Sequence, residues 1–197
     1  MTNKKNIYEF KKSLNVGNMG EEKIKDFLLS LNHVDKIESV QNIKKYQDED
    51  IDFIITFKNN EKCTVEVKTD TYKSGNLYYE TVSCVEKNTL GCLEKTKADY
   101  IFYYFCEYDR LYILKTKPFR QWVKNEILKF NENPNESVLN KKEVFNKVTF
   151  GYKKGLYTSE GYTIPLNYIE KTLLNTKIYK RFDALSSKIT TKTAWLF

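Results

Sequence analysis

The chain of 197 residues suits one domain, and its 41% hydrophobic and 15% aromatic content is enough for a packed core and excludes global disorder. The excess of 33 Lys and Arg over 26 Asp and Glu gives a net charge of +7, which favours a polyanionic partner, although codon bias of an AT-rich genome would give the same excess. One histidine and four cysteines without a C-x-x-C pair argue against a zinc site or a histidine-based nuclease, and no apolar run is long enough to span a membrane. We therefore expect a soluble, cytoplasmic protein without membrane contact.

The first third of the chain predicts a helix and then a strand. Residues 1–15 are basic with scattered apolar positions, which fits a short helix or an arm. Helical spacing then recurs over residues 17–32, at Ile24, Phe27, Leu28 and Leu31. Glu21 and Glu22 fall in the first turn, where they suit the helix dipole. Residues 36–45 predict a strand with Ile37, Val40 and Ile43 as core positions, and residues 46–50 a polar, acidic loop.

The stretch from Asp48 to Asp70 predicts a β-hairpin, with strands over residues 51–58 and 62–69. Side chains alternate between the faces of a strand, so the loop length decides which residues share a face. A two-residue loop would mix carboxylates with core residues. A three-residue loop over residues 59–61 avoids this and gives the pairs Thr56 with Thr64, Ile54 with Glu66, and Asp52 with Lys68. One face is then almost wholly apolar, with Phe53, Ile55, Phe57, Cys63, Val65 and Val67.

The opposite face of this hairpin carries Asp52, Glu66 and Lys68 at one end. Two carboxylates a few ångströms apart repel, and each raises the pKa of the other. A divalent cation removes that repulsion, and Mg²⁺ prefers one or two carboxylates, waters and phosphate oxygens. With a lysine to orient water, these groups fit metal-assisted phosphodiester hydrolysis. The alternative is a solvated cross-strand pair worth a fraction of a kcal/mol.

Asp52, thirteen intervening residues and then Glu66-Val67-Lys68 resemble the signature of the PD-(D/E)XK nuclease superfamily. The superfamily includes restriction endonucleases, archaeal Holliday-junction resolvases and phage nucleases. The resemblance covers roughly residues 16–104, where the order of helix, strand and hairpin also fits. One departure is Ile51, which stands where many members have proline.

The resemblance implies an α/β fold with a restriction-endonuclease-like αβββαβ core, a central mixed sheet flanked by helices, and a small C-terminal α+β elaboration. It implies Mg²⁺, replaceable by Mn²⁺, held by Asp52, Glu66 and the backbone carbonyl of Val67, with Lys68 positioning water. Gly17 and Glu21 match a G-x-x-x-E pattern of resolvase-like members, which gives Glu21 a catalytic role. Three residues are supporting candidates: Glu22 as the fallback for Glu21, Asp50 as an alternative first ligand, and Glu80 from the phage-type stretch SGNLYYETVS.

The middle of the chain predicts further strands and a helix. Residues 77–83 read as extended, and residues 93–98 as one or two helical turns. The aromatic run over residues 100–106 predicts a strand buried on both faces, and residues 111–114 a returning strand. Pro118 begins a helix that ends near residue 131.

Residues 131–197 form the predicted C-terminal extension on a core of residues 1–130. Within it, residues 131–140 predict a loop, 141–145 a short helix, 148–150 a strand, 155–165 an irregular or weakly stranded segment and 167–174 a helix. The tail from residue 176 is basic and includes Lys188 and Lys192. The candidates for phosphate contact are Lys44, Lys45, Lys73, Lys177, Lys180 and Arg181.

These patterns together favour a metal-dependent nuclease that acts on DNA. A homodimer would suit such an enzyme, because a cutter of duplexes must address two strands. Two other classes stay open: a non-cutting nucleic-acid-binding or regulatory protein on the same fold, phage-encoded for example, and a protein-binding factor.

Overall fold

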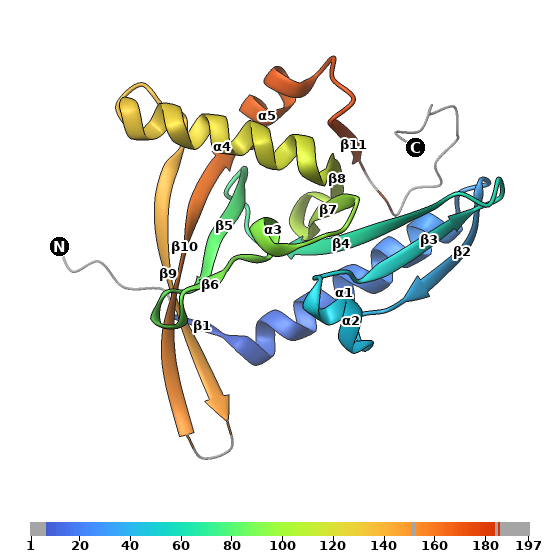
Figure 1. Cartoon of the computed structure of the whole chain (residues 1–197), viewed down its shortest axis with the longest axis horizontal. Helices are drawn as coiled ribbons and strands as arrows, with labels where there is room; N and C mark the ends of the chain where they lie inside the picture. Colours follow the sequence, from blue (N-terminus) through green and yellow to red (C-terminus); the bar gives the residue numbers. More distant parts are fainter. Residues whose placement is uncertain (1–6, 151–152, 184, 186–197) are drawn as a thin grey trace.

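The computed structural model describes residues 7–150, 153–183 and 185 and is a mixed α/β fold built on two sheets (Figure 1). The central mixed sheet has the strand order β11-β8-β7-β4-β3-β2, and the second sheet has the order β1-β9-β10-β5-β6. Within the described residues no helix combines the length and the apolar character that a membrane crossing requires.

Helix α1, Phe10–Leu29, packs its apolar face against the central sheet through Ile24, Phe27 and Leu28. Because α1 begins at Phe10, the predicted start at residue 17 is almost two turns too late. Glycine inside a helix costs only about 1 kcal/mol relative to alanine, so the glycines at 17 and 20 did not end the helix. Gly20 permits a close approach, because a Cβ there would lie 1.9 Å from Oγ1 of Thr69 on β4. This contact brings the middle of α1 onto the central sheet.

Strand β2, Val34–Ser39, is shorter than predicted, and the one-turn helix α2, Lys44–Asp48, replaces its expected end and part of the expected loop. The chain leaves the sheet at Val40, whose N–H bonds the carbonyl of Asp52, and then turns through a bond from the Ile43 N–H to the Val40 carbonyl. Ile43 is consequently 51% exposed and is not a core residue, whereas Val40 is buried.

Strands β3, Phe53–Phe57, and β4, Lys62–Asp70, form the predicted hairpin, but the predicted register is wrong by two residues. Phe53 pairs with Val65 and Ile54 with Thr64, and the Phe57 N–H bonds the Glu61 carbonyl, so residues 58–60 form the loop. A shift of two preserves the faces. The six predicted apolar residues are all buried in one cluster, while Asp52 moves from opposite Lys68 to beside Glu66 and Val67.

Strand β7, Tyr100–Phe105, is buried along its whole length in the centre of the sheet, as predicted. It runs parallel to β4, and β8, Arg110–Lys115, returns antiparallel to it. Because β7 presents alternate residues to opposite faces, it contributes to two separate apolar clusters. The connection from β4 to β7 contains β5, Asn76–Cys84, β6, Thr89–Leu90, and the one-turn helix α3, Cys92–Lys95.

Beyond residue 130 the chain differs most from the predictions. The expected short helix over residues 141–145 is instead part of β9, Asn140–Phe150. The segment over 155–165, predicted to be irregular or weakly stranded, is part of the strand β10, Lys153–Pro165, and the two strands form one long hairpin. β9 pairs in parallel with β1, Ile7–Glu9, and β10 pairs antiparallel with β5. Helices α4, Thr116–Glu132, and α5, Leu166–Leu173, lie within two residues of their predicted positions. The strand β11, Tyr179–Asp183, lies at the edge of the central sheet, in the segment that the sequence marked only as a basic tail.

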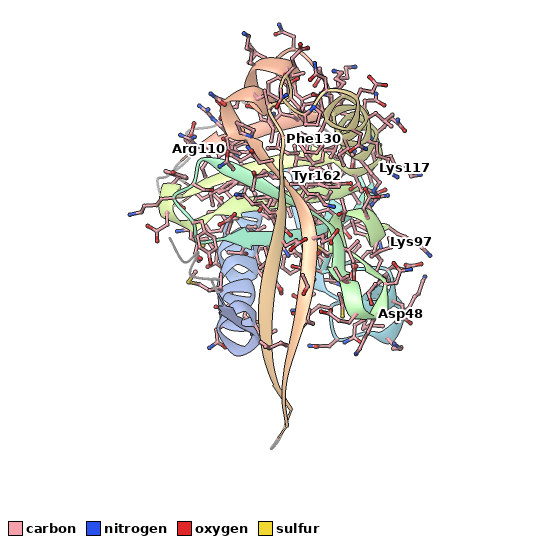
Figure 2. The ribbon with its side chains drawn as sticks, turned by 90° about the vertical axis from the view of Figure 1, so that its left-hand side faces the viewer. Asp48, Lys97, Arg110, Lys117, Phe130 and Tyr162 are labelled. Carbon is pink, nitrogen blue, oxygen red and sulfur yellow. The ribbon has the colours of Figure 1, made fainter. Side chains whose placement is uncertain are left out.

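The second apolar cluster lies where α4, α5 and β10 cover the other face of β7 and β8. Tyr162 of β10 packs edge-on against Phe130 of α4, with ring centroids 5.5 Å apart (Figure 2). The predicted division at residue 130 stays a prediction. Strands from beyond that residue join both sheets, since β9 and β10 pair in one and β11 pairs with β8 in the other.

Candidate active site

Asp52 and Glu66 meet where β3 begins. Asp52 immediately precedes β3, and its Oδ2 accepts the Val67 backbone N–H at 2.7 Å. Glu66, on β4, is only 8% exposed, and its carboxyl group hydrogen-bonds to that of Asp52. A hydrogen bond between two carboxyl groups requires that one of them carries a proton. The pair is therefore a site with room for one negative charge unless a cation is added.

Burial is the main reason that both acids hold their protons more tightly than usual. It raises the pKa of Asp52, although the Val67 N–H and the Glu66 carboxyl group act in the opposite direction. Burial also raises the pKa of Glu66 well above its usual value, and the nearby charges of Asp52 and Asp50 raise it further. Glu66 has the larger set of causes for a raised pKa, since burial and both neighbouring carboxylates act in the same direction.

The Val67 peptide is oriented toward the same place. The N–H and C=O of one residue in a strand point to the same neighbouring strand. Since the Val67 N–H meets the Asp52 carboxylate just before β3 starts, the Val67 carbonyl lies on that side too. Two carboxylates and one peptide oxygen are thus gathered at the open end of the hairpin.

Lys68 lies two residues beyond Glu66 on the same face of β4 and is half-buried. The Cys92 sulfur, Glu80, Tyr103 and Glu66 raise the pKa of its amine, against the effect of burial. Burial raises the pKa of the Cys92 thiol itself to about 12, so the carboxylates carry the negative charge near Lys68 at neutral pH. Lys68 is then an ammonium ion throughout the physiological range. Its Nζ forms no ion pair or hydrogen bond with any residue that the structure describes.

Glu21 reaches the site from α1. Burial, and then the charge of Asp52, raise the pKa of Glu21 to about 7. Its Oε2 accepts the Gln41 Nε2 amide at 2.8 Å, and the other amide atom, Gln41 Oε1, is buried without a hydrogen-bond partner among the described residues. Glu22, the predicted fallback, is exposed. Gly17 has open space around a Cβ, so the glycine that the packing requires is Gly20.

Asp50 and Glu80 flank the pair in different ways. Asp50 has a left-handed backbone, φ 47°, and its Oδ1 lies 2.9 Å from Lys95 Nζ of α3. The structure therefore places Asp52, not the alternative Asp50, against Glu66. Glu80 on β5 influences the Lys68 pKa, and Gly91 packs against it so tightly that a Cβ would lie 2.1 Å from the Glu80 carbonyl oxygen.

Hydrogen bonds from Thr96 and Arg120 hold the segment next to Asp50 in place, and no sequence pattern indicated them. Thr96 Oγ1 donates to the Asp50 carbonyl at 2.6 Å. The guanidinium of Arg120, on α4, donates to the carbonyls of Leu93 at 2.9 and 3.0 Å and of Thr96 at 2.8 Å. No spacing in the sequence links these residues to Asp52, because they come from three separate segments: Gln41 lies between β2 and α2, Cys92 and Thr96 lie in the connection between β4 and β7, and Arg120 lies on α4.

The six basic candidates do not form one surface. Three are paired with acids: Lys44 with Asp48 at 2.7 Å, Lys73 with Glu107 at 2.9 Å, and Arg181 with Glu170 at 2.9 Å. Lys45 Nζ lies 5.4 Å from the Tyr46 ring centroid. Lys177 is exposed and Lys180 half-buried near β11, at the sheet edge beyond β7 and β8 from β4 (Figure 1). Lys188 and Lys192 lie outside the described residues.

An open depression of about 680 Å³ adjoins Glu21, between α1 and the segment from β2 to α2. Its lining is mostly polar: Asn18, Glu21, Glu22, Lys25, Ser39, Gln41, Asn42 and Gln47, with Leu14 and Phe53. Within the described residues no group of three or more His, Cys, Asp or Glu side chains is arranged to hold a metal ion.

Comparisons of this chain with protein-family models, with characterised proteins and with solved structures gave no match. Its function has to be inferred from the geometry and chemistry of the site.

Proposed function

We propose that this protein is a metal-dependent nuclease that hydrolyses phosphodiester bonds in DNA. The observation that carries the proposal is the pair of Asp52 and Glu66, which share a hydrogen bond on a largely buried face with the Lys68 ammonium beside them. Such a cluster is destabilising by itself, because both carboxyl groups have raised pKa values. A bound cation would convert that repulsion into binding energy.

The order of elements supports a restriction-endonuclease-like core. Helix α1 precedes the antiparallel strands β2, β3 and β4, and the next strand of the same sheet, β7, is parallel to β4. This follows the αβββαβ order that the resemblance implies. The difference lies in the second α position, where the connection holds β5, β6 and the single turn of α3 in place of a long helix.

The donor atoms fit Mg²⁺. Hard cations take oxygen ligands, and Mg²⁺ commonly uses one or two carboxylates with waters and phosphate oxygens in its other positions. Asp52, Glu66 and the Val67 carbonyl provide that number, without a third side chain from the described part of the chain. When bound, the metal would supply Lewis-acid activation of the phosphate and of water.

The protein's own residues have separable roles in this reaction. The Lys68 ammonium is charged at neutral pH, so it cannot remove a proton, and it serves to orient water and to neutralise charge that develops on the phosphate. Glu21, with a pKa of about 7, is the group whose protonation changes in the working range, so it is the candidate proton acceptor. Gln41 holds the Glu21 carboxylate in place through its amide.

The test is purified protein with Mg²⁺ or Mn²⁺ against plasmid, linear duplex, single-stranded, junction and RNA substrates. We expect cleavage of a DNA substrate that chelation abolishes, and loss of that cleavage in Glu66→Ala and Lys68→Ala. Lys62→Ala, an exposed lysine on the same strand, is the matched control and should cleave normally. Robust cleavage by both Glu66→Ala and Lys68→Ala would reject the site. Binding without cleavage of any substrate would favour the non-cutting alternative.

A further inference from the structure

The β9–β10 hairpin extends well beyond the strand that supports it. β10 pairs with β5 only over Glu160–Pro165, and the only strand partner of its earlier residues, 153–159, is β9. Within this stretch Ser159 is still buried and the Thr158 N–H donates to the Glu86 carboxylate at 2.9 and 3.0 Å. At about 3.4 Å per residue this stretch is roughly 20 Å long. Figures 1 and 2 show it projecting below the rest of the molecule. We call residues 144–150 and 153–159 the β-arm; β1 lies along its β9 edge at residues 145–147.

The β-arm joins the body of the molecule beside Glu80, the residue of β5 that also raises the pKa of Lys68. Gly161 pairs with Glu80 at a register shift in β10, and a Cβ on Gly161 would lie 2.4 Å from the Tyr79 carbonyl oxygen and 2.9 Å from Glu80 Cα. Tyr157, within the β-arm, is half-buried, and burial, Glu80 and Cys84 raise its pKa while Lys68 lowers it. A ligand held along the β-arm would therefore meet the body of the molecule at Glu80.

Positive charge predominates at the end of this hairpin that is farthest from β5, where the strand partners of Lys153 and Lys154 are Phe150 and Thr149. Lys142 and Lys147 also belong to the hairpin, but Glu143 follows Lys142 and Glu9 of β1 is the register partner of Lys147. Lys141 is paired with Glu160 at 3.5 Å and is not counted. The register puts positions 147 and 154 on one face of the ribbon and positions 142 and 153 on the other, because cross-strand partners share a face. Lysine positions on both faces suit a ribbon that has a row of phosphates on each side.

We propose that the β-arm enters the major groove of B-form duplex DNA and holds the duplex against the Asp52–Glu66–Lys68 site. The proposal deepens the proposed function and rests on it for the substrate class. The major groove of B-form DNA is about 12 Å wide and admits a two-stranded β-ribbon. The major groove of A-form RNA is too deep and narrow for this, and a single strand has no paired phosphate walls. Lysine contacts to phosphates fix position without reading sequence.

The experiment measures binding in the absence of metal, so it does not depend on cleavage. Lys153→Glu/Lys154→Glu tests the β-arm. Lys58→Glu/Lys62→Glu is the matched control, because these exposed lysines flank the turn of the other hairpin, β3–β4, and both variants lower the net charge equally. Fluorescence anisotropy is recorded with a DNA duplex, an RNA duplex of the same sequence and single-stranded DNA. Thermal melting of both variants checks that they fold.

We expect wild type to prefer the DNA duplex, the β-arm variant to lose roughly tenfold or more in affinity for it, and the control to lose much less. The neutral variant Lys153→Gln/Lys154→Gln should reduce the dependence of affinity on salt by about two phosphate contacts. Equal losses in the β-arm variant and the control, or equal wild-type affinity for RNA duplex, would overturn the proposal. Binding through the β-arm without any cleavage would support this inference and contradict the proposed nuclease function. Cleavage together with binding that does not depend on the β-arm would support the nuclease function and contradict this inference.

Discussion

Two long β-hairpins of this molecule carry their charges in opposite ways. The β3–β4 hairpin packs one face into the core and gathers Asp52, Glu66 and Lys68 on the other, where burial raises the pKa of the two acids and neighbouring negative groups raise that of Lys68. The β9–β10 hairpin leaves the body and distributes lysines along a free ribbon. A buried charge interacts strongly with a few specific neighbours, whereas exposed charges each interact weakly and their contributions to binding add up. The first arrangement suits chemistry and the second suits binding.

The largest expected effect concerns the buried acids. Asp52→Asn and Glu66→Gln should each reduce cleavage by about a thousandfold or more, because each removes a charge that holds the metal. Glu66→Gln should also raise the melting temperature of the metal-free protein by a few degrees, since the buried amide needs no proton to stay neutral. Single-turnover cleavage and thermal melting measure the two effects. Glu61→Gln, on the exposed turn of the same hairpin, should change neither, and a similar activity loss there would contradict the assignment.

Lys68 should separate chemistry from binding. Lys68→Met should lower the rate of cleavage about a hundredfold while changing duplex affinity only slightly, because the proposed role of this ammonium is to stabilise charge on the reacting phosphate. The β-arm variants should show the reverse pattern, with weaker binding and a nearly normal rate at saturating DNA. Comparing single-turnover rates with anisotropy titrations tests this contrast. An equal loss of affinity in Lys68→Met would place Lys68 among the binding lysines.

Two glycines in α1 provide a matched pair for the packing of the site. Gly20→Ala should cost about 1–3 kcal/mol of unfolding free energy and reduce cleavage, because its Cβ would meet Thr69 Oγ1 at 1.9 Å and displace the helix that carries Glu21. Gly17→Ala should be neutral or stabilise by up to about 1 kcal/mol, since nothing lies within 4 Å of its Cβ. Denaturant unfolding measures both. Equal destabilisation by the two substitutions would contradict this packing.

The smallest expected effect is the pH dependence of the metal-free protein. Glu21 has a pKa near 7 in the folded state and 4.5 as its ordinary value, so between these two values the folded state binds more protons than the unfolded state. Stability should therefore fall as pH rises from about 4.5 to 7, by about 1–2 kcal/mol once solvent screening is included. Melting curves at several pH values should show the fall, and Glu21→Gln should reduce it, while the raised pKa values of Asp52 and Glu66 account for the part that remains. Added Mg²⁺ should offset it with release of protons.

The sequence was sufficient for elements whose apolar residues set a clear period. The β3–β4 faces, the buried strand β7 and helices α4 and α5 all have such a period, and the structure has them at or near the predicted positions. The period fixes a face but not a loop length. Asn60 adopts a left-handed backbone, φ 69°, and the turn closes over residues 58–60, so Asp52 shifted by two positions relative to Lys68.

Other parts depend on contacts that a local pattern does not contain. The β9–β10 hairpin has apolar residues only at scattered positions among lysines and polar residues, so the sequence predicts just a short strand over residues 148–150 and an irregular or weakly stranded segment over 155–165. Its order comes from pairing with β1 and β5, which lie far away in the chain. For the same reason Asp52, Glu66, Lys68 and Glu21 were recognised from their spacing, whereas Gln41, Cys92 and Arg120 were not.

The guanidinium of Arg120 binds two carbonyls of the connection that in turn holds Asp50, two residues before Asp52. Helix α4 thereby holds in place the segment that leads into β3 and carries Asp52, although no atom of that helix belongs to the candidate site. Random mutagenesis that selects for lost cleavage should therefore recover changes at Arg120 in protein that still folds and still binds DNA. Under the proposed function, the presence of Asp52 and Glu66 in a related chain would then not be sufficient to predict cleavage, because Arg120 would also be needed.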